Sequence, residues 1–119
     1  MLVRSIAELL AANLHDVFGC RDADRRAAMI GDIYADDIVF TDPDGVTTGR
    51  AQVAAKIDKL LAGIPEQVTF TDAGPIYLGP DRGALAWRLG PADAPIARGV
   101  DVITVDAGRI TSMVTLLAP

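Results

Sequence analysis

The stretch Tyr34-Ala35-Asp36-Asp37-Ile38-Val39-Phe40-Thr41-Asp42-Pro43-Asp44-Gly45 decides how this chain folds. Its β-branched and aromatic residues at 38–41 predict a short strand, and the Asp-Pro-Asp-Gly sequence at 42–45 predicts a tight turn at its end. Two helix-like segments precede this stretch, and one helix-like segment and then only strand-like segments follow it. This order predicts a segregated α+β fold rather than alternating βαβ units.

Three segments carry apolar residues at helical spacing. The first is expected to run from Leu2 to Val17, the second from Asp22 or Asp24 to about Tyr34, and the third from 49 to 64. Asn13 lies near the centre of the apolar stripe of the first segment. A buried amide there must find a hydrogen-bond partner or face a cavity.

The second half of the chain predicts strands at 67–71, with an extension to 78 left open, and at 83–89, 96–105 and 109–117. The turns between them are short, so an antiparallel meander is the simplest topology. In segment 96–105, alternate residues form two faces, and neither face is polar. Because helices can cover only one of these faces, we expect a second copy of the chain to cover the other and form a homodimer.

Length and charge exclude several classes of protein. The 119 residues predict a single domain spanning 1–119. The formal net charge of −5 argues against nucleic acid as a partner, and charges within the apolar N-terminal segment argue against a membrane span. One cysteine and one histidine exclude an intramolecular disulfide and a Cys/His zinc site, which favours a reducing, cytoplasmic location. Since common cofactor motifs are absent too, we expect neither cofactor nor metal.

Asp101 is the most unusual residue because it shares an otherwise apolar strand face with Ile103 and Val105. If that face looks into an apolar cavity, desolvation raises the pKa of the carboxyl, and the group can stay protonated and donate a hydrogen bond. Two ordinary alternatives remain open, namely exposure at a sheet edge and an ion pair with an arginine. The candidate arginines are Arg88, Arg98 and Arg109.

Asp42 ends the short strand and precedes a proline, which favours an extended backbone at that position. It can act as a general base if an apolar pocket holds it near a substrate C–H group. The alternative is an Asx-type turn in which the carboxylate accepts a hydrogen bond from its own backbone. Asn13 likewise has two interpretations, either orienting a ligand carbonyl or hydroxyl or making a helix-to-strand hydrogen bond in the core.

Three groups of residues carry a resemblance to a known family: the stretch 34–45, Gly49-Arg50, and the segment 99–105 followed by Gly108-Arg109-Ile110. With them the chain resembles the nuclear transport factor 2-like (NTF2-like) superfamily, and within it the SnoaL-like and ketosteroid isomerase-like group. The resemblance implies a cone-shaped, cystatin-like fold, in which a curved antiparallel sheet wraps around a pocket closed by three helices. It also implies dimers that form through the outer face of the sheet.

The resemblance further implies roles for two carboxyl groups. Asp42 matches the proton-shuttling carboxylate of ketosteroid isomerases, and Asp101 matches the protonated acid of their oxyanion hole. The tyrosine that completes this hole has no counterpart, because Leu14 occupies the matching stretch. Apart from the resemblance, the candidates for contact with a ligand are Asn13, Tyr34, Phe40, Trp87 and Ile103. The aromatic residues among them are equally suited to an ordinary core, which is the usual case.

Two functions follow as hypotheses. The first is an isomerase- or cyclase-type enzyme that abstracts a proton next to a carbonyl group in a small hydrophobic ketone or polyketide-like compound. The second is a non-catalytic module of the same fold that binds a hydrophobic ligand or serves for dimerisation. The enzymatic hypothesis requires that the carboxyl groups of Asp42 and Asp101 open into one pocket.

Overall fold

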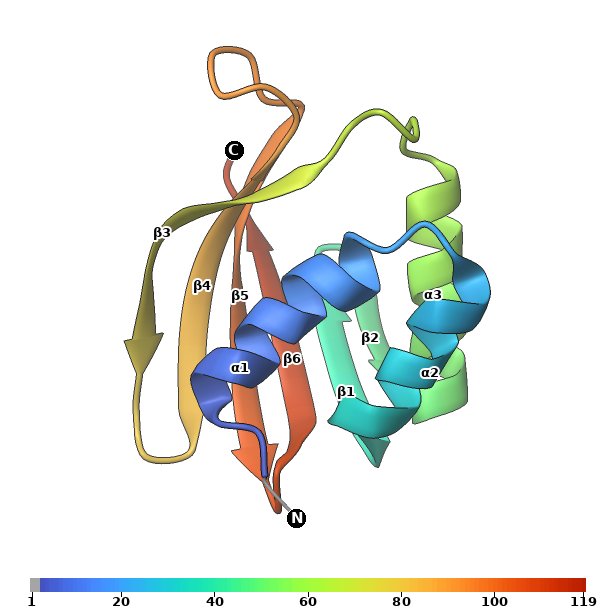
Figure 1. Cartoon of the computed structure of the whole chain (residues 1–119), viewed down its shortest axis with the longest axis vertical. Coiled ribbons are helices and arrows are strands. Elements are labelled where there is room, and N and C mark those ends of the chain that lie inside the picture. The colour runs from blue at the N-terminus through green and yellow to red at the C-terminus, as the bar shows by residue number, and fades with distance from the viewer. Residues whose placement is uncertain (1–2) are drawn as a thin grey trace.

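The computed structural model describes residues 3–119, which fold into a helical layer packed on one sheet (Figure 1). The helical elements are α1 (Ile6–Ala12), the π-helix η1 (Asn13–Phe18) that continues it, α2 (Ala23–Ile33) and α3 (Arg50–Ala62). The strands are β1 (Tyr34–Asp42), β2 (Gly45–Thr48), β3 (Phe70–Leu78), β4 (Arg82–Leu89), β5 (Ala97–Asp106) and β6 (Arg109–Leu117).

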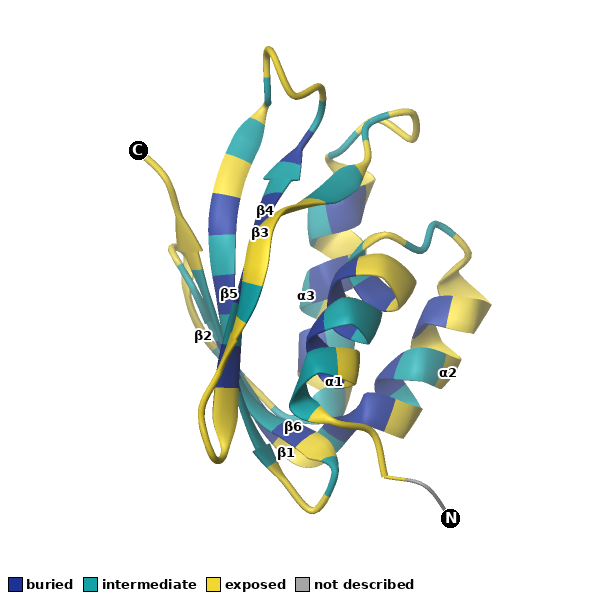
Figure 2. Cartoon of the chain, turned by 60° about the vertical axis from the view of Figure 1, so that its left-hand side comes forward, coloured by how far each residue is buried: buried dark blue, intermediate teal, exposed yellow. Residues whose placement is uncertain are grey.

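The strands form one six-stranded sheet in the order β2-β1-β6-β5-β4-β3. The helices all lie on one face of this curved sheet, while no helix covers the other face among the described residues (Figure 2). The α+β prediction and the meander predicted for the last four strands are therefore confirmed. The expectation of a wholly antiparallel sheet is wrong at one pair, because β1 runs parallel to β6.

The first helix differs from its predicted span of 2–17. It begins at Ile6, where Ser5 Oγ accepts a hydrogen bond from Glu8 N at 3.1 Å and Glu8 Oε1 accepts one from Ser5 N at 2.9 Å. This reciprocal capping box stops the helix from extending further toward the N-terminus. Leu2, the predicted first residue, lies outside the described residues. From Asn13 onward the turn widens into a π-helix, which apolar periodicity does not reveal.

The stretch 34–45 also forms more strand than predicted. β1 begins at Tyr34, directly after α2, rather than at Ile38, and β2 pairs with it so that Asp42 lies opposite Gly45. We predicted no strand at 45–48, because the threonines there also suit the start of a helix. A four-residue strand of this kind depends on its neighbour, and here β1 supplies the backbone hydrogen bonds.

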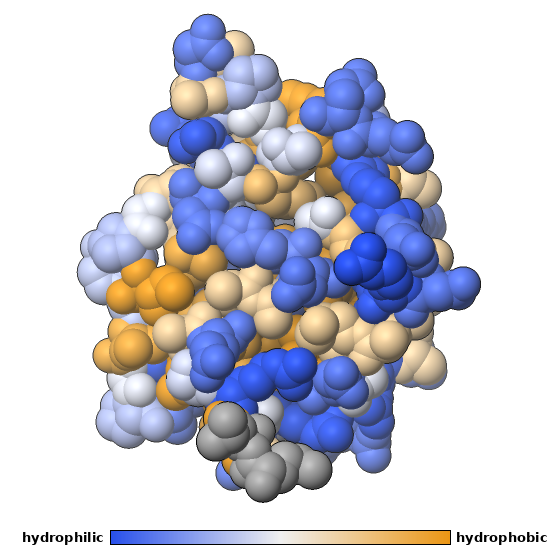
Figure 3. Space-filling view, viewed as in Figure 1, coloured by the Kyte–Doolittle hydropathy of each residue, from blue (hydrophilic) through white to orange (hydrophobic). Residues whose placement is uncertain are grey.

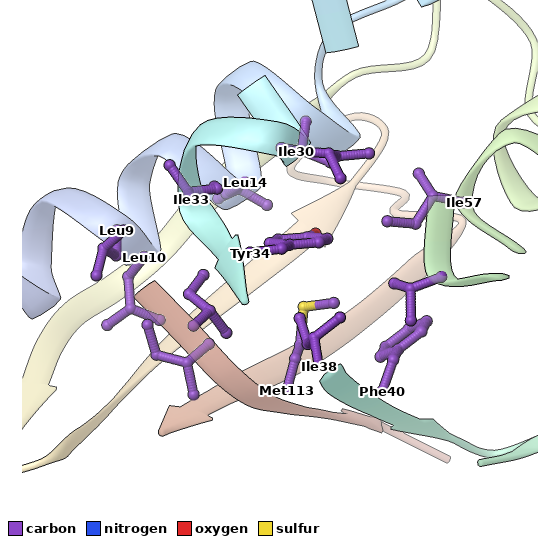
Figure 4. Packing of buried hydrophobic residues seen from close by; sticks show 14 of the residues in the cluster. Leu9, Leu10, Leu14, Ile30, Ile33, Tyr34, Ile38, Phe40, Ile57 and Met113 are labelled. Atoms are coloured by element: carbon purple, nitrogen blue, oxygen red, sulfur yellow. The ribbon is translucent and has the colours of Figure 1, made fainter. Parts of the chain in front are cut away.

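The hydrophobic core lies between the sheet and the helices (Figure 4). In β4 and β5, buried residues alternate with more exposed ones, so the two faces of these strands separate as predicted. On the edge strand β3, the register shifts between Asp72 and Ile76. Within residues 3–119, every helix is too short or too polar to cross a bilayer.

Candidate functional site

A cavity of about 180 Å³ lies between the sheet and the helices, at the end of the molecule where α3 and β6 terminate. Its wall is almost entirely apolar, and hydrophobic residues surround a recess between polar residues in the upper part of the surface (Figure 3). Two carboxyl groups, those of Asp42 and Asp101, line this same cavity. The other lining residues are Leu14, Phe18, Phe40, Pro43, Leu60, Leu61, Ile64, Phe70, Trp87, Leu89, Ala97, Thr115 and Leu117.

Asp101 lies on the inner face of β5 and is only 5% exposed. Its Oδ1 accepts hydrogen bonds from Trp87 Nε1 at 3.0 Å and from Thr115 Oγ1 at 2.8 Å. Burial raises the pKa of the Asp101 carboxyl to about 6, and the two hydrogen bonds oppose that rise without cancelling it. Because its partners are neutral donors, the predicted alternative of an ion pair with an arginine is wrong.

Asp42 lies at the end of β1, and its side chain is 8% exposed. Its Oδ1 accepts a hydrogen bond from Asp44 N at 3.0 Å, which forms the Asx-type turn that the sequence left open. Its Oδ2 lies 3.4 Å from Lys56 Nζ, and the same ammonium lies 3.1 Å from Asp44 Oδ2. The turn and the ion pair hold the carboxylate in one orientation at the cavity wall.

A row of aromatic rings crosses the cavity wall. Phe18 packs edge-on against Phe40 at 6.3 Å and against Phe70 at 6.0 Å, and Phe70 packs edge-on against Trp87 at 5.4 Å. These T-shaped contacts join η1 to the sheet and fix the ring positions. Phe40 and Trp87, two of the predicted ligand contacts, are thus brought together at the cavity.

Three other predicted ligand contacts lie in the core rather than on the cavity wall. Asn13, Tyr34 and Ile103 are fully buried, and none of them lines the cavity. The Tyr34 hydroxyl donates a short hydrogen bond to Asn13 Oδ1, and Asn13 Nδ2 donates to Met113 Sδ at 3.2 Å. Figure 4 shows the Tyr34 ring between the helices and Met113. For Asn13, the structure therefore contains the second alternative, a helix-to-strand hydrogen bond in the core, because the amide group finds its partners inside the protein.

Removing the Tyr34 hydroxyl by Tyr34→Phe is expected to lower the free energy of unfolding by about 1–2 kcal/mol, because Asn13 Oδ1 loses its buried donor. Asn13→Leu is expected to cost a similar amount, since the Tyr34 hydroxyl is then left unpaired. The double variant should lose less than the sum of the two single losses. Urea unfolding of the four proteins measures this coupling, and strictly additive losses would contradict it.

Sequence reasoning missed three residues that shape the site. Thr115 was not singled out, although its place on a strand beside Asp101 is a detectable signal once the pairing of β5 and β6 is known. Lys56 lies on α3, and only the folded chain brings it to the Asp42 turn. Phe18 reaches the cavity through the widened turn of η1.

Other titratable groups in the described part of the chain form no further catalytic cluster. His15 Nε2 lies 2.6 Å from Asp72 Oδ1 in an exposed pair, and Cys20 is a free thiol. Residues 3–119 contain no group of three or more His, Cys, Asp or Glu side chains placed to hold a metal ion.

The fold and the cavity define a class of protein, namely an α+β cone with a pocket between its helices and an open, curved sheet, as in NTF2-like and cystatin-like structures. The family model of the SnoaL-like domain matches residues 11–113. The chain therefore belongs to the SnoaL-like family. No curated protein matches the sequence.

Solved structures place the chain in the same group. A SnoaL-like family protein from Agrobacterium tumefaciens, provisionally named an isomerase, is 25% identical with a TM-score of 0.85, covering 96% of this chain and 97% of that one. A protein from Jannaschia, provisionally named a SnoaL-like polyketide cyclase, is 12% identical with a TM-score of 0.78, covering 98% and 91%. One from Kribbella flavida, provisionally named a ketosteroid isomerase, is 18% identical with a TM-score of 0.69, covering 93% and 76%.

Proposed function

We propose that the cavity binds a small hydrophobic ketone, that Asp42 moves a proton next to its carbonyl group and that Asp101 donates a hydrogen bond to the carbonyl oxygen. The observation that carries this proposal is the presence of both carboxyl groups on the wall of one apolar cavity. The neighbour from Agrobacterium tumefaciens that is provisionally named an isomerase agrees with chemistry of this kind.

In this reaction, Asp42 accepts a proton from the carbon beside the carbonyl, and the electron pair of the broken C–H bond moves to form the enolate. Asp101 in its protonated form donates a hydrogen bond to the carbonyl oxygen, where negative charge develops. Asp42 then returns the proton to a different carbon, so the overall change is a shift of a double bond. Because burial raises the pKa of Asp101 to about 6, the donor form makes up about half of the protein at pH 6 and a smaller share as the pH rises.

The size of the cavity limits the substrate. Benzene fits an apolar cavity of about 150 Å³, and the present cavity of about 180 Å³ is of the same order. A monocyclic or short-chain ketone therefore suits it better than a large polycyclic one. The aromatic and aliphatic wall supplies the apolar contacts, with Phe40 and Trp87 among them.

An absorbance assay of cyclohex-3-enone, which becomes conjugated on isomerisation, tests the proposal. Wild type is expected to convert the ketone, and Asp42→Asn should lose at least about a hundredfold in kcat/KM because the base is gone. Asp44→Asn is the matched control, since Asp44 also contacts Lys56 but is 73% exposed and does not line the cavity. Equal rates for wild type and Asp42→Asn would remove Asp42 from the mechanism.

One observation favours the second function, a non-catalytic binding module. Both oxygens of Asp42 already have partners within the protein, the Asp44 amide and the Lys56 ammonium. A structural carboxylate would be held in the same way. Under this function, wild type and Asp42→Asn bind cyclohexanone with equal affinity in calorimetry, and neither converts the unsaturated ketone.

We also propose a homodimer through the outer sheet face, in the cytoplasm. Support for the dimer comes from apolar residues at successive paired positions of β5 and β6, Val100 with Leu116 and Val102 with Val114, on the face without helices. Leu116 is 56% exposed in the single chain. The free thiol of Cys20 is compatible with a reducing compartment.

Val102→Glu is expected to shift the protein toward monomers, because each copy would place a charge in the apolar contact. Sedimentation velocity at several concentrations measures this shift. Leu78→Glu is the control. Leu78 is 62% exposed at the edge of the sheet, but it pairs with Gly83, which faces the helices, so Leu78 lies outside the proposed contact. A wild-type protein that stays monomeric at high concentration would contradict the dimer.

A further inference from the structure

Two neutral side chains donate hydrogen bonds to the same oxygen of Asp101, a residue of the cavity wall. Trp87 Nε1 lies 3.0 Å from Oδ1, and Thr115 Oγ1 lies 2.8 Å from it. The other carboxyl oxygen, Oδ2, has no hydrogen-bond partner within residues 3–119. The two oxygens of this carboxyl group therefore have different surroundings.

Asp101 Oδ2 is open to the cavity. Within residues 3–119, Arg88 Nε is the one buried side-chain nitrogen or oxygen that lacks a hydrogen-bond partner. Because Oδ2 also lacks a partner, it must retain some accessible surface. Asp101 lies on the inner face of β5, between β4 and β6, and is only 5% exposed, so this surface faces the cavity.

The chemistry of the two donors determines which oxygen can carry the proton of the neutral acid. The indole N–H of Trp87 can only donate, so Oδ1 must offer it a lone pair. A carbonyl oxygen has two lone pairs, and the Thr115 hydroxyl takes the second one. The hydroxyl oxygen of a carboxylic acid is a weaker acceptor than its carbonyl oxygen. Two donors at Oδ1 therefore favour the proton on Oδ2.

The indole ring of Trp87 is held in place from two sides. It packs edge-on against Phe70, with the ring centroids 5.4 Å apart. Across the strands, Trp87 pairs with Gly99, and a Cβ at this glycine would lie only 2.5 Å from Trp87 Cζ2. The missing side chain leaves room for the ring beside β5, and from there Nε1 reaches Asp101, two residues further along that strand.

We propose that Trp87 and Thr115 are positioning residues that keep the proton of Asp101 on Oδ2, where it points into the cavity. A ligand must then bring its acceptor, here the carbonyl oxygen of a ketone, next to Oδ2 rather than Oδ1. The same two hydrogen bonds stabilise the carboxylate, and so they limit how far burial raises the pKa of Asp101. The role in turnover rests on the proposed ketone chemistry, whereas the position of the proton does not.

Few other titratable groups face Asp101. Among the described residues that line the cavity, Asp42 is the only other titratable one, and the residues that η1 and α3 contribute to the wall are uncharged. Burial and the nearby Asp101 carboxylate raise the pKa of Tyr34 well above its ordinary value, so this phenol stays neutral. A change in the titration of Asp101 after substitution of Trp87 or Thr115 therefore reports on their hydrogen bonds.

Infrared spectroscopy at pH 5 tests which oxygen carries the proton. Asp101 is then largely protonated, and subtracting the spectrum of Asp101→Asn isolates its C=O stretching band. Thr115→Val and Trp87→Phe are each expected to move this band to higher wavenumber, because the carbonyl oxygen Oδ1 loses a donor. Thr111→Val is the matched control, since that hydroxyl lies on the same strand but donates to Thr104 O, and the band should stay in place.

A band that stays in place in both Thr115→Val and Trp87→Phe would put the proton on Oδ1 and overturn the proposal. Turnover of cyclohex-3-enone gives a second readout. Wild-type kcat/KM should fall about tenfold per pH unit above about pH 6, and Thr115→Val should move this fall to higher pH. A lower rate with an unmoved pH profile would overturn the positioning role. Shifted infrared bands without any turnover would support the position of the proton and contradict only the proposed function.

Discussion

At about pH 8, the Asp101→Asn variant is expected to be more stable than wild type by about 3 kcal/mol. The gain follows from burial, which raises the pKa of the Asp101 carboxyl from 3.8 to about 6 in the folded protein. Each pKa unit corresponds to about 1.4 kcal/mol. Asparagine removes the buried charge and keeps an oxygen that can accept the hydrogen bonds of Trp87 and Thr115.

The sign of this effect follows from proton binding. Between about pH 4 and 6, the unfolded chain has lost the Asp101 proton while the folded protein retains it, so raising the pH destabilises the wild-type fold. The amide of the Asp101→Asn variant does not titrate, so the difference between the two proteins grows across this window and is lost below about pH 4. Because Asp101 is almost fully buried, solvent screening reduces the effect little.

Urea unfolding of both proteins at several pH values measures the effect, with Asp93→Asn as the control. Asp93 is exposed, so its substitution should leave the pH dependence of wild type unchanged. A constant difference between Asp101→Asn and wild type at every pH would contradict the raised pKa. In the ketone assay, the same variant should react more slowly than wild type, because it loses the acid that donates a hydrogen bond to the carbonyl oxygen.

Arg21→Met is expected to lower the free energy of unfolding by about 3 kcal/mol, since it breaks a network of charge-assisted hydrogen bonds. The Arg21 guanidinium donates to four backbone carbonyl groups at the end of α3 and in the loop that follows. The distances are 3.0 Å to Leu61 O, 3.1 Å to Ile64 O, 3.1 Å to Pro65 O and 3.3 Å to Val68 O. Leu61 O and Pro65 O each also accept a backbone hydrogen bond, from Ile64 N and Val68 N, so Arg21 is a second donor to these two carbonyls.

The loss should also affect the cavity, because Leu61 and Ile64 line its wall. Thermal unfolding measures the stability, and hydrogen exchange of residues 60–64 measures the local loosening. Arg21→Lys is expected to recover only part of the stability, because a single ammonium cannot reach all four carbonyls in the geometry of the planar fork. Arg25→Met, on the exposed side of α2, should cost less than about 0.5 kcal/mol. Equal losses for Arg21→Met and Arg25→Met would contradict the bridging role.

The sequence allowed the fold class to be predicted because its signals are local. The turn at Asp42-Pro43 depends on neighbouring residues, and the alternating strand around Asp101 follows from a period of two. Local signals do not show which strands meet across the sheet. The parallel pairing of β1 with β6 joins residues far apart in sequence, and we did not predict it.

The candidate site was predictable only in part, for the same reason. Both cavity carboxyls were recognised as chemically unusual, yet their partners lie on other elements. The structural alternatives for Asp101 were an ion pair with arginine or exposure at a sheet edge, whereas it is buried and Trp87 and Thr115 reach it from the strands on either side. Tyr34 was placed at the ligand as one of several aromatic residues, and Asn13 because a buried amide near a cavity can orient a ligand carbonyl or hydroxyl. In the structure the Tyr34 hydroxyl donates a hydrogen bond to the Asn13 amide oxygen. The sequence does not show that these two groups lie within hydrogen-bond distance.

The register shift of β3 affects whether copies of this chain can assemble into filaments by pairing edge strands. An edge strand with free N–H and C=O groups can recruit another strand and begin a fibre. Here Gly74 and Pro75 fall within the shifted part of β3, and proline has no N–H to offer a neighbour. The opposite edge, β2, is four residues long. Both edge strands of the sheet are therefore poor templates for strand addition. This opposes amyloid-like growth of a chain in which 50% of the residues are hydrophobic.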